Sequence, residues 1–215
     1  ADFALFMNGL QQLAAADIPV YCCTGNHDPL SSWSAEYGTL PSNTHLFSVE
    51  TPSFFTFIKG DDGCDRHDRR DDAGDGVRGA HNAASVPGTH NVASVPSAPG
   101  AHSAASASDP IRVVLGGRGY YARSFPQDRD VSEGITWANC CEALPGSYEP
   151  DFTIGVIHTG LNIDPTRSPV EPRELMRRGL DYWACGHIHQ KVLIPSDAPV
   201  IAFSGCPQGR AIQET

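Results

Sequence analysis

The chain has 215 residues, is 40% hydrophobic and carries a formal net charge of -10 at pH 7. This length and composition fit one globular domain and exclude a chain that is disordered throughout. The negative charge argues against a nucleic-acid site made of lysine and arginine alone, although binding through metal cations stays open. No run approaches the roughly eighteen apolar residues of a membrane helix and no signal peptide is evident, so we expect a cytoplasmic protein that does not contact a membrane.

The seven cysteines include two adjacent pairs, Cys22-Cys23 and Cys140-Cys141, and no Cys-x-x-Cys spacing. An odd number without paired spacing favours neither a disulfide framework nor a zinc knuckle. We interpret these cysteines as small buried side chains in a reducing compartment.

The first predicted element is an amphipathic helix over residues 2–16, with Asp2 as its cap. Its apolar face consists of Phe3, Phe6, Met7, Leu10, Leu13 and Ala14. Such a helix needs a sheet to pack against, so we expect strands before Ala1 and interpret the chain as an N-terminally truncated fragment.

Residues 17–23 are predicted to form a short buried strand that ends at the sequence Gly25-Asn26-His27-Asp28. A helix followed by a strand and a polar loop is an α/β unit. Two more strands are expected at residues 46–49 and 54–58, separated by a turn at Pro52.

The composition changes abruptly between residues 61 and 109, where a run of charges precedes a degenerate Ala, Ser, Pro, Gly and His repeat. This segment has little to bury and is predicted to be a disordered insertion between two parts of one domain, residues 1–60 and 110–215. Its histidines, His81, His90 and His102, recur with the repeat; we favour repeat drift over a metal-binding tract. Deleting the insertion is predicted to leave thermal stability nearly unchanged.

The second part of the domain is predicted to hold strands at residues 111–115, 152–157, 182–185, 192–194 and 200–203, and a helix at 171–178. The first of these strands is expected to enter a turn at Gly116–Tyr121. A Gly-rich phosphate loop is the weaker alternative there, because the glycine spacing is wrong and no helix follows. We interpret Arg118, Arg123 and Arg129 as part of a solvated mixed-charge loop rather than a DNA track.

Four histidines follow predicted strands: His27, His158, His187 and His189. A single histidine in this position is usually structural, but open α/β sheets build their sites where strands end. His187 and His189 flank one residue, so in an extended segment both point to the same side. Imidazole, amide and carboxylate groups together are a ligand set for borderline divalent cations such as manganese, iron or zinc.

The order Gly25-Asn26-His27-Asp28, a strand ending in His158, then Gly186-His187-Ile188-His189 resembles the calcineurin-like metallophosphoesterases. The words "DYWACGHIHQKVLIP" and "PVIAFSGCPQGRAIQET" are similar to its bacterial DNA-repair exonuclease branch, the SbcD and YhaO type. The resemblance implies an α/β fold, a four-layer αββα sandwich present here in part. It also implies DNA phosphodiester hydrolysis with two divalent metal ions, manganese by precedent.

By this resemblance, Asn26, His158 and His187 would hold one metal ion and His189 the other. His27 would face the phosphodiester as a catalytic residue, and Asp28 would orient its imidazole. Arg210 could reach a phosphate, although a structural role is the alternative. The family further implies an SMC-type ATPase partner and a homodimer.

Two family signatures that should precede Gly25, an Asp-x-His and a Gly-Asp-x-x-Asp, are absent from the chain. Asp65-Arg66-His67 and the segment Gly60–Asp65 imitate them, but both come after the first motif and are rejected as ligands. We therefore expect an incomplete binuclear centre and an inactive fragment. The alternatives are a phosphatase or nucleotide hydrolase of the same superfamily, and a non-catalytic scaffold.

Overall fold

The structure is a computed structural model, and it describes residues 2–33, 39–59, 65–68, 110–164, 167–194 and 200–206. A seven-stranded sheet has the strand order β4-β3-β5-β6-β7-β9-β8, and a separate two-stranded sheet has the order β1-β2. The bounds of the strands are β1 Val20–Cys22, β2 Thr44–Leu46, β3 Ser53–Lys59, β4 Asp65–Asp68, β5 Ile111–Arg118, β6 Phe152–His158, β7 Tyr182–Gly186, β8 Val192–Ile194 and β9 Val200–Phe203. The helices are α1 Asp2–Ala15, the 3-10 turn η1 Leu30–Ser32, α2 Trp137–Ala143 and α3 Pro172–Arg177.

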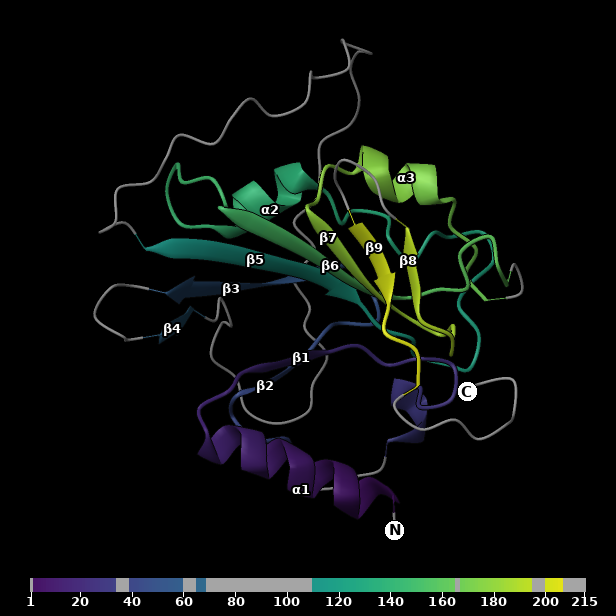
Figure 1. The fold of residues 1–215 in the computed structure, drawn as a ribbon, viewed down its shortest axis with the longest axis horizontal. Coiled ribbons are helices and arrows are strands. Elements are labelled where there is room, and N and C mark those ends of the chain that lie inside the picture. Colours follow the sequence, from purple (N-terminus) through teal and green to yellow (C-terminus); the bar gives the residue numbers. More distant parts are fainter. Residues whose placement is uncertain are drawn as a thin grey trace.

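The elements form four layers (Figure 1). Helices α2 and α3 lie on one face of the large sheet, whereas β1 and β2 lie on the other side with α1 beyond them. The two sheets meet through aromatic side chains, with Tyr21 and Phe47 packing 5.7 and 5.1 Å from the ring of Phe55 in β3. This arrangement confirms the α/β class and the predicted αββα layering.

The centre of the large sheet is parallel, and both of its edges are antiparallel. Strands β5, β6, β7 and β9 run parallel to one another, while β3 and β4 on one side and β8 on the other pair in antiparallel fashion. Parallel strands need covering on both faces, and the two helices and the small sheet supply that cover. The carboxyl ends of β5, β6 and β7 therefore share one edge of the sheet.

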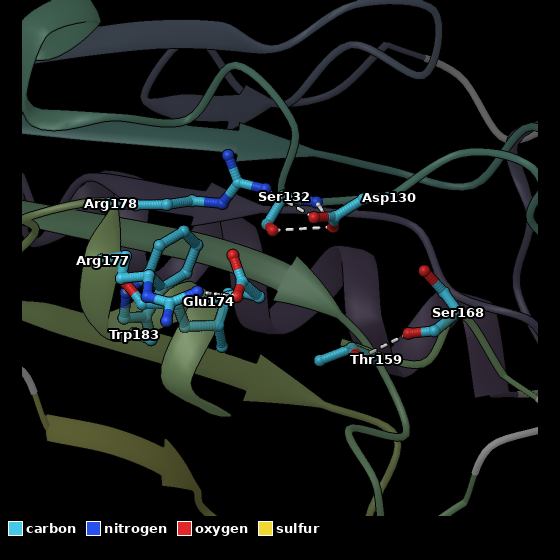
Figure 2. Close-up of polar contacts among 9 residues, drawn as sticks. Asp130, Ser132, Thr159, Ser168, Glu174, Arg177, Arg178 and Trp183 are labelled. Atoms are coloured by element: carbon cyan, nitrogen blue, oxygen red, sulfur yellow. Dashed lines mark hydrogen bonds and ion pairs between the residues drawn. The ribbon is translucent and has the colours of Figure 1, made fainter. Parts of the chain in front are cut away.

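The main core lies between the large sheet and helices α2 and α3. Trp183 is its largest fully buried side chain, and its indole N–H donates to the carbonyl of Leu175 in α3. On β6 the buried positions are Thr153, Gly155 and Ile157. Because successive side chains of a strand point to opposite faces, His158 points away from this core. Figure 2 shows the ion pair of Arg178 with Asp130, which ties the residue after α3 to the loop after β5.

The predicted turn at Gly116–Tyr121 is wrong for its first three residues, because β5 continues to Arg118. Both glycines are needed for packing instead: a Cβ on Gly116 would lie 2.8 Å from the ring of Phe54, and one on Gly117 would lie 2.5 Å from the ring of Phe47. Arg118 is also not solvated. It is buried, donates to the carbonyl of Glu50, and burial lowers the pKa of its guanidinium.

Two further elements differ from the sequence prediction, and one is confirmed. The second strand ends at Leu46, because serine side chains hold residues 48–50 in a turn: Ser53 accepts from the Ser48 N–H, and Ser48 from the Glu50 N–H. Helix α2 was not predicted, although Thr136 caps it by accepting the N–H of Asn139. The helix at residues 171–178 is confirmed as α3, and Gly179 follows it with φ +80°.

The two ends of the predicted insertion lie on neighbouring strands. Lys59 at the end of β3 is the register partner of Ile111 at the start of β5. Asp65–Asp68 lies inside the predicted insertion and forms β4, a four-residue edge strand paired with β3. The rest of residues 61–109 lies outside the described residues, so the division into three segments stays a prediction.

No helix among the described residues is long and apolar enough to cross a bilayer.

Candidate metal centre

The site begins where two central strands end side by side. His158 is the last residue of β6 and is the register partner of Gly186, the last residue of β7. The Thr159 N–H donates to the Gly186 carbonyl over 3.1 Å, which extends the pairing one residue past the strands. His158 and the segment that starts at His187 are thereby brought to one edge of the sheet, as the sequence predicted.

The loop that follows β1 brings Asn26 to the same place. Oδ1 of Asn26 lies 2.7 Å from Nε2 of His158, and the Asn26 side chain is buried. The loop is fastened to the end of β5, because Thr24 Oγ1 donates to the Tyr120 carbonyl over 2.7 Å and accepts the Tyr120 N–H over 2.9 Å. Residues 132 positions apart in the sequence are thus in direct contact.

Glycine is required where the first loop crosses His158. A Cβ on Gly25 would lie 2.6 Å from both Cε1 and Nδ1 of that ring, and one on Gly186 would lie 3.1 Å from Nδ1. A Cβ at either position would displace the imidazole or the backbone. The ring of His158 is held from a third side by Tyr120, whose ring centroid lies 5.2 Å away in an edge-on arrangement.

His187 lies beside His158, with the two ring centroids 5.3 Å apart. Its backbone has φ +106°, a conformation that residues with a side chain rarely adopt. Nε2 of His187 lies 2.9 Å from Oδ2 of Asp164, a residue of the loop after β6. Sequence reasoning missed Asp164, because no motif includes it.

The electrostatics of His158 show that the other three predicted histidines lie within electrostatic reach of it. The pKa of His158 is lowered to about 4, first by burial of the imidazole and then by the electrostatic effect of His187, His27 and His189, in that order. His158 is therefore neutral at pH 7. A neutral imidazole is the form that binds a metal ion.

The two exposed histidines flank this pair. His27 directly follows Asn26, and His189 lies two residues after His187; both are exposed. The backbone carbonyl of His189 accepts the Cys206 N–H over 2.9 Å. The carboxylate of Asp28 accepts the N–H of Gly25 over 3.2 Å, so it closes the loop that carries Asn26 and His27. Its orienting effect on the His27 imidazole stays a prediction.

The remaining predicted residues lie elsewhere or are not described. Arg210 lies outside the described residues. Asp65-Arg66-His67 lies in β4, which is separated from β6 by the two strands β3 and β5 in the sheet order. The rejection of this Asp-x-His imitation agrees with its place at the sheet edge.

The side chains at the strand ends fit one divalent cation in their chemistry. His158 and His187 supply imidazole nitrogens and Asn26 supplies an amide oxygen, the donor types that manganese, iron and zinc accept. Within the described part of the chain, no three His, Cys, Asp or Glu side chains are grouped to hold a metal ion. The candidate set therefore consists of two imidazoles and the amide oxygen of Asn26.

The comparison with protein families decides the assignment. A family model described as calcineurin-like phosphoesterase matches residues 2–191. The chain belongs to this family. Calcineurin-like phosphoesterases hydrolyse phosphoesters with bound metal ions, usually two, so the side chains at the ends of β6 and β7 are the candidate metal ligands of this domain.

A curated relative agrees with this assignment over a shorter stretch. The chain is 35% identical over 72 residues to "Uncharacterized metallophosphoesterase YhaO" of Bacillus subtilis (strain 168). The match covers 32% of this chain and 18% of that protein. No solved structure matches the chain.

Proposed function

We propose that the protein containing this phosphoesterase domain is a DNA-repair exonuclease that cleaves DNA phosphodiesters with two manganese ions. The observation that carries the proposal is the contact between Asn26 and His158 with His187 alongside, formed from three loops at one sheet edge. The sequence segments around the second histidine motif, Gly186-His187-Ile188-His189, resemble the exonuclease branch and support DNA as the substrate. Manganese is proposed on family precedent.

In this proposal Asn26, His158 and His187 hold one ion, and His189 contributes to the other. Two bound cations would supply the positive charge needed to activate a water and to stabilise the charge that develops on the phosphate. The low pKa of His158 serves this role, because the imidazole stays neutral. The donors come from loops fastened to the sheet, so the site is organised before the ligand arrives.

His27 is the proposed catalytic residue of this chain. Its imidazole is exposed beside the buried Asn26 and lies within electrostatic reach of His158. This position suits a group that protonates the leaving oxygen of a bound phosphodiester. Asp28 stabilises the loop through its bond to the Gly25 N–H and, in the proposal, orients His27. Arg210 is proposed as a phosphate contact.

The proposed partners follow from the same resemblance. They are DNA, an SMC-type ATPase and a second copy of the protein, in the cytoplasm. The net charge of -10 agrees with a DNA site whose positive charge comes from bound cations. In size-exclusion chromatography with light scattering we expect a dimer, and a monomer at all concentrations would remove this part of the proposal.

The test of the function is a substrate panel assayed with the natural gene product that contains these residues. End-labelled single- and double-stranded DNA is compared with p-nitrophenyl phosphate and nucleotides, each with and without Mn²⁺. We expect Mn²⁺-dependent shortening of DNA from an end, lost in His187→Ala and retained in Glu174→Ala, a surface control. Hydrolysis of the phosphomonoester with inert DNA would support a phosphatase instead, and inactivity on every substrate would support a scaffold.

The catalytic role of His27 has a separate test. His27→Gln is expected to lower the rate by about 10²- to 10⁴-fold. Its Mn²⁺ affinity should stay near that of the unmodified protein, because His27 is not a proposed ligand. Equal losses of affinity and rate would instead make His27 part of the metal-binding set.

A further inference from the structure

The loop between β6 and α3 carries a carboxylate that reaches the second histidine motif. Oδ2 of Asp164 lies 2.9 Å from Nε2 of His187, 23 positions later in the sequence. The His187 side chain is 15% exposed and that of Asp164 is 36% exposed, so the contact lies at the rim of the site. Closing the loop does not require this contact with His187, because the backbone hydrogen bonds within the loop already close it.

Backbone hydrogen bonds around Gly160 fix the position of Asp164. The Asp164 N–H donates to the Gly160 carbonyl over 2.9 Å, and the Gly160 N–H donates to the Arg167 carbonyl over 2.7 Å. The Arg167 N–H returns to the Asp164 carbonyl over 3.3 Å. A Cβ on Gly160 would lie 2.0 Å from the carbonyl oxygen of Asp164, so only glycine permits this close approach.

The base of the loop is held by one threonine. Thr159 Oγ1 donates to the Ser168 carbonyl over 2.7 Å, a contact drawn in Figure 2, and accepts the Leu161 N–H over 3.0 Å. Leu161 and Ser168 have φ +47° and +43°, and the side chain of Leu161 is fully buried. Residues with side chains adopt such angles only where the surroundings hold them, and they are concentrated at functional sites.

His187, the partner of Asp164, also has a positive φ of +106°. Positive φ angles therefore occur at His187 itself and on either side of Asp164 in its loop, within a region bonded to the ends of β6 and β7. A neutral imidazole carries a proton on only one of its two ring nitrogens, and a carboxylate can accept a hydrogen bond only from that one. In the neutral ring, the contact at Nε2 therefore places the proton there. Nδ1 is then left with the lone pair that a cation requires.

We propose that Asp164 is a positioning residue that fixes the tautomer and ring orientation of His187 so that Nδ1 is the nitrogen offered to a divalent cation. The role for the cation rests on the proposed function, whereas the tautomer can be tested without it. Carboxylates behind histidine ligands raise the basicity of the ring and restrict its rotation. The loop Thr159–Val170 is the element that supplies this carboxylate.

The first experiment measures the tautomer in the metal-free chain. Long-range ¹H–¹⁵N spectra of ¹⁵N-histidine-labelled protein are recorded for the unmodified chain and for Asp164→Ala, with His187→Gln used to assign the signal. We expect a slowly exchanging Nε2 proton on His187 that is lost in Asp164→Ala. Identical His187 signals in the two proteins would overturn the proposal whether or not the protein binds metal.

The second experiment measures Mn²⁺ affinity by calorimetry. Asp164→Ala is expected to bind about 10- to 100-fold more weakly than the unmodified chain. Asp164→Asn is expected to lose less, because its amide oxygen can still accept from Nε2. Ile163→Ala, an exposed neighbour in the same loop, and Glu174→Ala, which removes one surface carboxylate, are the controls and should bind normally.

The two experiments separate the proposals. If the unmodified chain binds no Mn²⁺ but Asp164→Ala loses the His187 proton signal, the proposed role of the site in metal binding is rejected. The proposed effect of Asp164 on the His187 tautomer is then still supported. If the unmodified chain binds Mn²⁺ and Asp164→Ala binds equally well with a lower melting temperature, Asp164 serves only to hold the loop and the inference is wrong.

Discussion

On each side of the central sheet a ring packs directly on a glycine. Trp183 lies over Gly155 on the helix side, where a Cβ would come within 2.2 Å of the indole. His158 lies against Gly25 on the opposite side, where a Cβ would come within 2.6 Å of the imidazole. The same close approach excludes water from a core in one case and holds the ring of a proposed metal ligand in the other. Packing that stabilises the fold and packing that prepares a site can therefore be separated by mutation.

The helix side should show the largest loss of stability. Trp183→Ala removes a fully buried ring and its bond to the Leu175 carbonyl, and Gly155 cannot fill the space. We expect the free energy of unfolding to fall by about 3–5 kcal/mol. Urea denaturation followed by circular dichroism measures this, and a loss below about 1 kcal/mol would show that Trp183 does not organise the core.

The site side should instead show a dependence on pH in the metal-free protein. Burial holds the pKa of His158 near 4, below the ordinary value of about 6.5 for histidine. As the pH falls from 6.5 toward 4, the unfolded chain takes up a proton at this residue and the folded chain does not, so stability declines.

We expect this decline to reach about 2–3 kcal/mol by pH 4. His158→Asn removes the titrating group, so the difference between its urea midpoints and those of the unmodified chain isolates the contribution of His158. Parallel midpoints for the two proteins between pH 6.5 and 4 would contradict the low pKa.

The comparison can be sharpened with Gly25→Ala, which adds one methyl group beside His158. Overpacking of this kind costs about 1–3 kcal/mol of stability. The larger effect is expected on Mn²⁺ binding, which should weaken at least tenfold because the ring and its contact with Asn26 are displaced. Calorimetry and urea denaturation of one sample measure both. Unchanged Mn²⁺ affinity with lowered stability would mean that Gly25 belongs to the core rather than to the site.

Residues that carry a local pattern were predictable, and residues placed by distant packing were not. Asn26, His158 and His187 follow apolar strands, and strand ends are where such sheets hold their sites. Asp164 has no such signal, because its position depends on positive φ angles at Leu161 and Ser168 that no sequence pattern indicates.

The same distinction between local patterns and distant packing explains the errors in the predicted fold. Gly116 and Gly117 indicate a turn by composition, yet they extend β5 because Phe54 and Phe47 from distant segments pack on them. Helix α2 has only seven residues, too short for a clear period, although Thr136, a residue type favoured at the N-cap, was a signal that could have found it.

The smallest effect is expected when a glycine with open surroundings is replaced by alanine, the change already described for Gly25. Gly9 lies in α1 with nothing within 4 Å of an added Cβ. Alanine there restricts the unfolded chain and suits the helix, so Gly9→Ala should stabilise the protein by about 0.5–1 kcal/mol and leave Mn²⁺ affinity unchanged. A rise in the urea midpoint for Gly9→Ala beside a fall for Gly25→Ala would show that the close contact with His158, and not the loss of a glycine as such, causes the damage at the site. A fall at both positions would remove that distinction, because it would mean that the exposed face of α1 is packed in solution.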